Sequence, residues 1–264
     1  MYNIAIDTHV HSIFSGHAYC TYKELWAEAA ESGLSGFGVT DHMGSLSTIT
    51  GGGEINAQVL FAQYDHIICQ NLNPRIINEV KIYHSVEIDI ARKDGSLFGQ
   101  YIVNDFFGSK NGDMTDVFLD HVDYAVASVH MLDEYPHRLT KNEGTAMYIK
   151  AMQHPKVFIL GHITKNGVTF EADEVIKAAK DMGKAIELNE ASCKNDQASC
   201  RDIAIRCAKI GAMVAVGSDA HGIGAIGRFP HALKLLEEIS FPPELIVNGD
   251  VERFEMAIKF QSII

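Results

Sequence analysis

Short apolar runs recur along the chain, and most of them are continuous rather than alternating with polar residues. Continuous apolar runs are typical of parallel strands that are buried on both faces. The pattern therefore predicts strands at Asn3–His9, Gly36–Asp41, Lys81–Ile90, Tyr124–Val129, Val157–Gly161, Ala185–Asn189 and Ala212–Gly217.

Stretches with helical signals separate these runs. Thr21-Tyr22-Lys23-Glu24 has the spacing of a capping box, and Gly33 is well placed to end the helix that it begins. The regular alternation of strand and helix predicts an α/β fold, either a barrel or a doubly wound sheet. Further helices are predicted at Asn142–Gln153, Asp173–Met182, Ser199–Ile210, Pro230–Ser240 and Asp250–Phe260.

The segment Met43–Asn78 departs from this alternation. It contains Gly51-Gly52-Gly53, many polar residues and one helical stretch near Ala57–Asn71. We interpret it as an insertion over the mouth of the fold, with the glycines as a flexible lid, because the Lys-Ser/Thr context of a phosphate-binding loop is missing. No linker-like shift in composition and no repeat divides the chain, so we expect one domain over residues 1–264.

Charge and composition narrow the function classes. Lys and Arg number 22 against 34 Asp and Glu, which gives a net charge of −12 and argues against a broad nucleic-acid surface. A small phosphorylated substrate stays compatible if metal ions make its site locally positive. The start of the chain has no signal peptide and no apolar run is long enough to span a membrane, so we expect a cytoplasmic protein. The 5 cysteines form no C-x-x-C pair, and we interpret them as buried apolar residues.

The strand ends hold the candidate chemistry. In parallel α/β folds the active site lies at the C-terminal ends of the strands, so side chains there meet in space. Every predicted strand has a His, Asp, Glu or Asn at or near that end. In chain order they are His9 and His11, Asp41 and His42, Glu87, His130, His162, Glu187 with Asn189, and Asp219 with His221.

The first of these ends is Asp7-Thr8-His9-Val10-His11. Side chains alternate along a strand, so His9, His11 and Asp7 are expected on one face. Two imidazoles so placed can bind one metal ion, an acid behind them can orient a ring N–H, and His17 can reach a neighbouring ion. We interpret the remaining histidines as surface or locally hydrogen-bonded residues: His66, His84, His121, His137, His154 and His231.

The serial arrangement resembles the PHP family, named for polymerase and histidinol phosphatase domains. The resemblance rests on Asp7-x-His9-x-His11-Ser12, Thr40-Asp41-His42, His130 and Ser218-Asp219-Ala220-His221, with Glu87 and His162 at intervening positions. The length of the chain and its close, Phe241-Pro242-Pro243-Glu244, look most like the small stand-alone bacterial branch. The resemblance implies a distorted (β/α)7 barrel with a metal site at the C-terminal ends of the strands.

The resemblance further implies a trinuclear centre, most often with zinc and sometimes with manganese or iron. The implied ligands are His9, His11, Glu87 and Asp219 for one ion, Glu87, His130 and His162 for a second, and His17, His42 and His221 for the third. Seven imidazoles and two carboxylates suit zinc, iron or manganese better than calcium or magnesium.

The implied activity is hydrolysis of a small phosphate monoester, such as histidinol phosphate or a nucleotide, by a metal-bound hydroxide. Glu87 and Asp219 would act as ligands at the reacting centre, and Asp7 and Asp41 would orient ligating histidines. Asn189 and Ser218 are candidates for substrate contacts. Candidates for a phosphate clamp, which needs a cation near the mouth, are Arg92, Lys165 and Arg228.

Two other functions stay open at this point. An amidohydrolase-type barrel that hydrolyses a C–N bond or a lactone also begins with His-x-His, but it usually has a bridging lysine on its fourth strand, and Tyr124–His130 contains none. A PHP module can also be a non-catalytic accessory, but such copies often lose ligands and all nine positions are present here. The sequence does not indicate an oligomeric state.

Overall fold

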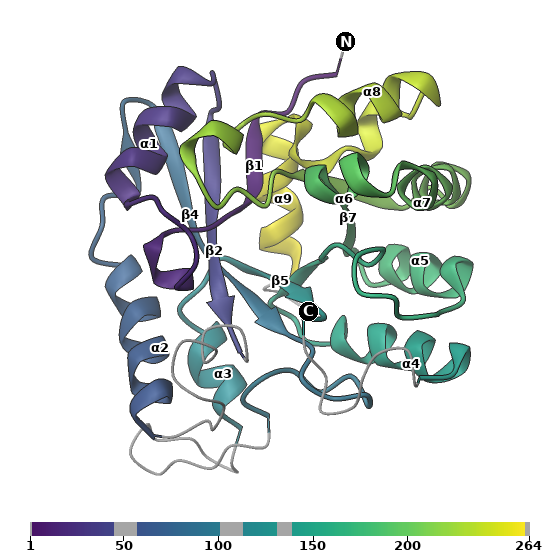
Figure 1. Ribbon diagram of the computed structural model, residues 1–264, viewed down its shortest axis with the longest axis horizontal. Helices are drawn as coiled ribbons and strands as arrows, with labels where there is room; N and C mark the ends of the chain where they lie inside the picture. The colour runs from purple at the N-terminus through teal and green to yellow at the C-terminus, as the bar shows by residue number, and fades with distance from the viewer. Residues whose placement is uncertain (1, 45–56, 101–112, 131–138, 262–264) are drawn as a thin grey trace.

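Seven parallel strands form a nearly closed barrel in the computed structural model, which describes residues 2–44, 57–100, 113–130 and 139–261 (Figure 1). The strands are adjacent in the order β1-β2-β4-β5-β6-β7-β8. All the predicted strands are confirmed, with ends that shift by at most three residues. They are β1 Ile6–Val10, β2 Gly36–Met43, β4 Val80–Asp89, β5 Tyr124–Ser128, β6 Val157–Leu160, β7 Ala185–Asn189 and β8 Met213–Gly217.

Helices surround the strands, with α1 and α2 on one side and α4 to α8 on the other (Figure 1). The capping box at Thr21 is formed: its hydroxyl accepts the Glu24 N–H, and the Glu24 carboxylate accepts the Thr21 N–H. The predicted helices are confirmed as α1 Tyr22–Glu31, α2 Ala57–Gln70, α4 Lys141–Ala151, α5 Ala172–Asp181, α7 Gln197–Ile210, α8 Pro230–Glu238 and α9 Val251–Gln261.

Several short elements have no counterpart in the sequence prediction. The helices α3, Met114–Leu119, and α6, Glu190–Asn195, have 6 residues each, which is too short for a hydrophobic period to show. Strand β3, Ile76–Ile77, pairs antiparallel with the start of β4. Among the described residues there are also four 3₁₀ helices: η1 Ile13–Ser15, η6 Ile223–Ala225, η7 Pro243–Leu245 and η8 Val247–Gly249.

The barrel interior is apolar at the N-terminal ends of the strands and polar at their C-terminal ends. Tyr83, Tyr124 and Phe158 form the inner cluster, and Phe254 of α9 packs against all three rings. Further along the same face of β4 come Ser85 and then the carboxylates of Glu87 and Asp89, which are both buried. Because α9 closes the apolar end, the polar end is the one that can admit a substrate.

Strands β1 and β8 do not form a regular ladder of backbone hydrogen bonds, and side chains help to join them. Among the described residues, the isolated bridge Val10↔Ala220 links the strand ends. The Asn248 amide, fully buried, donates to Ile6 O and Val216 O, both at 2.7 Å, and its Oδ1 accepts the Val216 N–H at 3.0 Å. We call this junction the β1/β8 seam; it holds the barrel together where regular backbone pairing does not.

A bulge in β1 changes which side chains face the interior. Between Asp7 and Val10 the strand advances three residues while its partner advances two, from Phe37 to Val39. Such an extra residue reverses the alternation of faces. Ile6 accordingly belongs to the inner cluster, whereas Val10 belongs to the outer one between strands and helices. The expectation that Asp7 shares a face with His9 and His11 is therefore wrong.

Other sequence-based expectations meet the structure as follows. Four cysteines are buried, as expected, whereas Cys69 is half-buried, and none of the five forms a disulfide. Among the described helices, none has both the length and the apolar character that crossing a membrane needs. The predicted glycine lid Gly51–Gly53 lies outside the described residues.

Candidate metal centre

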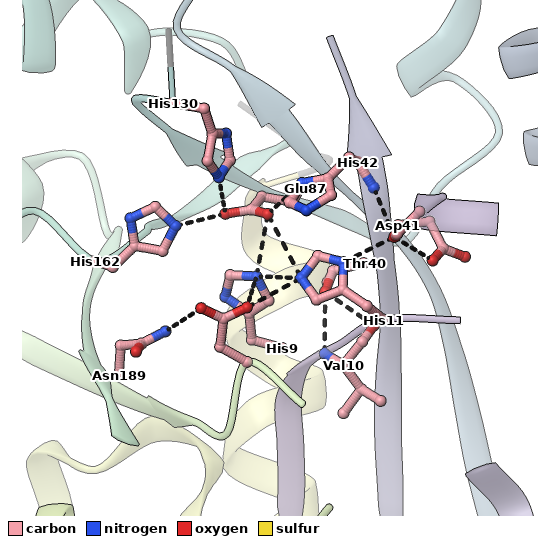
Figure 2. Close-up of polar contacts among 12 residues, drawn as sticks. His9, Val10, His11, Thr40, Asp41, His42, Glu87, His130, His162 and Asn189 are labelled. Atoms are coloured by element: carbon pink, nitrogen blue, oxygen red, sulfur yellow. Dashed lines mark hydrogen bonds and ion pairs between the residues drawn. The ribbon is translucent and has the colours of Figure 1, made fainter. Parts of the chain in front are cut away.

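All nine predicted ligands converge at the C-terminal end of the barrel, and Figure 2 labels six of them: His9, His11, His42, Glu87, His130 and His162. His9, His11, His42, Glu87 and His162 are buried, and the others line the mouth. Three sets of atoms lie close enough together to bind one ion each. These sets are His9, His11 and Asp219; His42, Glu87 and His130; and His11, His42 and His221.

Five of the seven histidines have one ring nitrogen held by a group outside the centre. His9 Nδ1 lies 2.7 Å from Glu187 Oε1, and His130 Nδ1 lies 2.7 Å from Asp89 Oδ1. His11 Nδ1 lies 2.9 Å from Ser15 Oγ. These acceptors place the ring proton on Nδ1 and leave the Nε2 lone pair for a metal, which is the usual arrangement around metal-ligating histidines. Backbone carbonyls do the same at the mouth, where Ser15 O faces His17 Nδ1 at 3.0 Å and Asp219 O faces His221 Nδ1 at 2.9 Å.

The remaining ring nitrogens point at one another. His9 Nε2 and His11 Nε2 are 3.1 Å apart, and His17 Nε2 lies 2.9 Å from His221 Nε2 and 3.3 Å from His42 Nε2. In the His9–His11 and His17–His221 pairs the ring protons are on Nδ1, so lone pairs face each other across the gap, which is unfavourable without a positive charge between them. The nitrogen donors therefore fit bound cations.

Glu87 lies at the centre of the imidazoles (Figure 2). Its Oε1 is 2.8 Å from His162 Nε2 and 3.3 Å from His130 Nε2, and its Oε2 is 2.8 Å from His42 Nδ1. Glu87 Oε2 and His42 Nδ1 are buried and, despite that distance, form no hydrogen bond with a described group. Buried polar atoms left without hydrogen bonds are rare in proteins, so this pair fits ligands of a shared ion.

The protonation states favour ligand binding. Burial lowers the pKa of His11 to about 3, and the neighbouring His42 contributes, so this ring is neutral. Burial also lowers the pKa of His17 and of His221. Burial would raise the pKa of Glu87, but the imidazoles of His130 and His9 hold it well below its usual value, so the carboxylate is ionised.

His9 and His130 differ from the other rings. Burial opposes protonation of His9, but the carboxylates of Glu187 and Glu87 raise its pKa well above the usual value. At His130, Glu87 and Asp89 overcome burial in the same way and raise the pKa to about 10. The same carboxylates attract any cation, so a metal ion at either ring competes with a proton for the site.

Within the described part of the chain, the two other predicted acids, Asp7 and Asp41, form no direct hydrogen bond with a ligating ring. Asp7 is buried, and its carboxylate accepts the backbone N–H groups of Ser218 and Gly227, both at 3.0 Å, and of His9 at 3.4 Å. It therefore fixes the loop after β8 rather than a ligating imidazole, which corrects the orienting role predicted from the sequence. The bulge in β1 is the physical reason.

Asp41 reaches the centre through a serine. Its Oδ1 accepts the Ser15 hydroxyl at 2.6 Å, and Ser15 Oγ in turn faces His11 Nδ1. The other oxygen, Oδ2, lies 3.0 Å from His66 Nε2. His66 thus has the local hydrogen bond that the sequence suggested, and its partner is an acid of the centre.

Sequence reasoning assigned no role at the centre to three residues: Glu187, noted only as a strand-end acid, and Asp89 and Ser15. Glu187 binds His9 through one oxygen and accepts the His162 N–H at 2.7 Å through the other. Asp89 and Ser15 hold His130 and His11. A signal existed for Asp89, which lies two residues after Glu87 and so on the same face of β4.

The backbone at two ligands is unusual. His162 has φ of 25° and Asp219 has φ of 55°, in the left-handed region that non-glycine residues seldom adopt. Gly217 precedes the second of these, and a Cβ there would lie 2.5 Å from Glu187 Oε1 and 2.7 Å from His9 Cβ. The centre therefore needs both a strained backbone and a glycine to bring its ligands together.

One of the predicted cations reaches the centre. Lys165 Nζ lies 3.2 Å from Asp219 Oδ2, and Asn189 Nδ2 donates to the same oxygen at 3.2 Å. Burial lowers the pKa of Lys165, but the nearby carboxylate of Asp219 outweighs burial and keeps this pKa raised, so the amine is charged. Arg228 pairs instead with Glu28 at 2.7 Å, and Arg92 lies exposed after β4.

Comparison with known proteins agrees with this geometry. A family model described as "PHP domain" matches residues 7–191, which is more than half of the chain. The chain belongs to the PHP domain family. A protein of Acetivibrio thermocellus named "Probable phosphatase" is 33% identical over 257 residues, covering 96% of this chain and 95% of its own. A second protein with that name, from Caldicellulosiruptor saccharolyticus, is 31% identical over 254 residues, covering 95% and 94%.

A solved structure of another protein has a similar fold. It is the histidinol phosphate phosphatase of Lactococcus lactis, complexed with zinc, L-histidinol and phosphate. The TM-score is 0.53 with 18% identity, over 90% of this chain and 94% of that one. At this identity the likeness concerns the fold alone.

Proposed function

We propose that this PHP protein is a metal-dependent phosphoesterase that hydrolyses a small phosphate monoester at a centre of three divalent ions. Zinc is the first candidate metal, followed by manganese and iron, because the donors are mainly imidazole nitrogens. The observation on which the proposal depends is the set of opposed Nε2 lone pairs around Glu87. The names of the two bacterial relatives and the zinc, histidinol and phosphate bound by the Lactococcus lactis enzyme support it.

In this proposal the residues divide among three ions. His9, His11 and Asp219 would hold one ion, with Glu87 Oε2 3.4 Å from His9 Nε2. Glu87 would bridge to a second ion held by His130 and His162. The third ion would be held at the mouth by His17, His42 and His221.

The charge of the loaded site explains how an acidic protein can bind a phosphate. Three divalent ions less two ligand carboxylates leave about +4, and such ions activate water and neutralise phosphoryl oxygens. The chain adds Lys165, whose charged amine at the mouth can contact a phosphoryl oxygen once Asp219 binds metal. Asn189 holds the other side of Asp219 in place.

The test combines elemental analysis with hydrolysis of p-nitrophenyl phosphate on one purified sample, before and after chelation. We expect two to three transition-metal ions per chain and turnover that stops on chelation and returns with zinc or manganese. Bound metal without hydrolysis of any phosphate ester would point instead to hydrolysis of a C–N bond or lactone. No metal and no hydrolysis would favour a non-catalytic accessory module.

Replacing ligands should separate chemistry from folding. Glu87→Ala and His42→Ala should each lower kcat/KM by about 10³-fold or more, because metal ions contribute several kcal/mol to such reactions. Glu87→Ala should also lose more metal, since the bridging carboxylate contacts two ions. His154→Ala is the control, because His154 pairs with Asp116 away from the centre. Wild-type rates in both ligand variants would refute the site, provided that circular dichroism shows intact folds.

A further inference from the structure

A polar pocket adjoins the metal centre on the side of β6 and α6. It measures about 270 Å³ and is lined by Thr164, Lys165, Ala191, Ser192, Asn195 and Asp196. Lys165 belongs to both sites, because its amine lies 3.2 Å from Asp219 Oδ2. We call this cavity the α6 pocket. A substrate whose phosphate contacts the metals and Lys165 would direct its remaining part here.

One side chain fixes α6 relative to the metal ligands. Asn189 donates from Nδ2 to Asp219 Oδ2 at 3.2 Å and accepts the Ser192 N–H at 3.0 Å as the cap of the helix. The same residue therefore holds a ligand of the centre and the first turn of the helix that forms the pocket wall. This link keeps the pocket at a set distance from the reacting atoms, as a specificity site requires.

The lining of the α6 pocket is hydrophilic. Ser192 is only 6% exposed, and its hydroxyl has no hydrogen-bond partner among the described residues. Asn195 and Asp196 add an amide and a carboxylate from the exposed rim. One oxygen of Asp196 accepts the Ser199 N–H at 3.2 Å, which fixes the carboxylate at the start of α7.

Charge and size restrict what fits. With the amine of Lys165 on the substrate phosphate, Asp196 is the remaining charge among the lining residues, and its carboxylate disfavours an acidic group on the leaving alcohol. At about 30 Å³ per water, a volume of this order holds roughly nine waters, or an organic group of about as many non-hydrogen atoms. A nucleoside is considerably larger.

We propose that the α6 pocket binds the leaving group of the substrate, a small alcohol that bears hydroxyl or amino groups and no acidic group. The inference rests on the proposed phosphoesterase function. In the reaction, water adds to phosphorus, the bond from phosphorus to the ester oxygen breaks, and the alcohol departs with a proton. Phosphate stays at the metal side while Ser192, Asn195 and Asp196 hold the alcohol.

The test compares substrates rather than absolute rates. The zinc-loaded enzyme is assayed with O-phosphoethanolamine, glycerol phosphate, 3-phosphoglycerate and p-nitrophenyl phosphate. We expect higher kcat/KM for the amino and hydroxyl esters than for the acidic one. Asp196→Asn keeps a side chain that can cap α7 but removes the charge. It should lower the ratio of kcat/KM for O-phosphoethanolamine to that for p-nitrophenyl phosphate about tenfold, the size of one charge-assisted hydrogen bond.

A matched control lies at the other end of the barrel. Asp250 is also exposed and also accepts the N–H three residues on, that of Arg253, at 2.8 Å. Asp250→Asn should leave the ratio unchanged. A preference for the acidic ester, or an unchanged ratio in Asp196→Asn, would overturn the α6 pocket while leaving the phosphoesterase intact. Failure of the wild type to hydrolyse any of the four esters would overturn both.

Discussion

Five histidines of the candidate centre have a partner on the ring nitrogen that faces away from it. Most of the candidate ligands were visible in the sequence because they lie at or near the end of a predicted strand. Their partners were harder to assign, because Glu187 and His9 are 178 positions apart and meet only once β7 and β1 lie in one barrel. Sequence reasoning thus proposed the donor residues but not the groups that orient them.

Glu187→Gln tests how much the contact that orients the His9 ring contributes to metal binding. The amide can accept the His9 ring proton through its oxygen, but its NH2 group then faces the His162 N–H, which now donates to Glu187 Oε2. Loss of such a partner typically weakens metal binding 10- to 100-fold, so we expect the zinc dissociation constant to rise by about that factor. Competition with a chromophoric chelator measures it.

The neighbouring acid Glu190 provides the control for this variant. Its carboxylate accepts the backbone N–H groups of His231 and Ala232 at the start of α8, away from the metal ligands. Glu190→Gln should therefore leave zinc affinity within about twofold of wild type. Equal zinc affinity in Glu187→Gln and wild type would show that the orienting contact contributes nothing.

At the scale of elements, hydrophobic pattern was a good guide to long segments and a poor guide to short ones. The strands were predictable because burial on both faces leaves continuous apolar runs. The bulge in β1 was not, because an extra residue between Asp7 and Val10 alters pairing without altering composition. The helix α6 was missed for its length, although Asn189 is a favourable cap.

The turn between α5 and β7 contains a buried lysine that should make stability depend on pH. Lys184 is 3% exposed and donates to His154 O and Pro155 O at 3.3 Å each, and burial lowers its pKa to about 8. The unfolded chain, with a lysine pKa near 10.4, binds more protons between these values. The free energy of unfolding should therefore rise with pH from about 8 to about 10.4 and lose this dependence below 8.

Lys184→Met isolates the effect. At pH 7 the variant escapes the cost of a buried charge, which we put at about 1–2 kcal/mol after allowing for solvent screening, and at pH 10.5 most of that advantage should disappear. Urea unfolding at both pH values, with chelator present, measures the difference. Lys180→Met is the control for losing a lysine-to-carbonyl bond, since exposed Lys180 donates to Ile210 O. A Lys184→Met advantage independent of pH would contradict the assignment.

The whole molecule separates stability from chemistry along the barrel axis. The apolar end, closed by Phe254 and the inner aromatic rings, stabilises the fold, and the buried ionisable groups occupy the opposite end. A polar interior of this kind is tolerated where hydrogen bonds or bound cations satisfy its groups. The sequence indicated the polar end through its strand-end histidines. The sequence did not predict how the barrel closes, because the β1/β8 seam depends on Asn248, a residue outside every predicted strand.

Asn248→Ala tests whether the seam supports the centre from a distance. The change removes three buried hydrogen bonds, to Ile6 O and to the N–H and carbonyl of Val216, of which the Val216 carbonyl keeps the Thr8 hydroxyl as a donor. We expect a loss of about 2–4 kcal/mol in the free energy of unfolding with chelator present. Zinc affinity should also fall, because β1 and the loop after β8 supply ligands from opposite sides of the seam.

Asn3→Ala is the control for Asn248→Ala. Exposed Asn3 donates one hydrogen bond to Gly249 O nearby, and the loss of this bond should change the free energy of unfolding by no more than about 0.5 kcal/mol. If Asn248→Ala destabilises the metal-free fold but binds zinc with wild-type affinity, the seam holds the barrel without positioning the ligands. If it changes neither, backbone pairing alone closes the barrel.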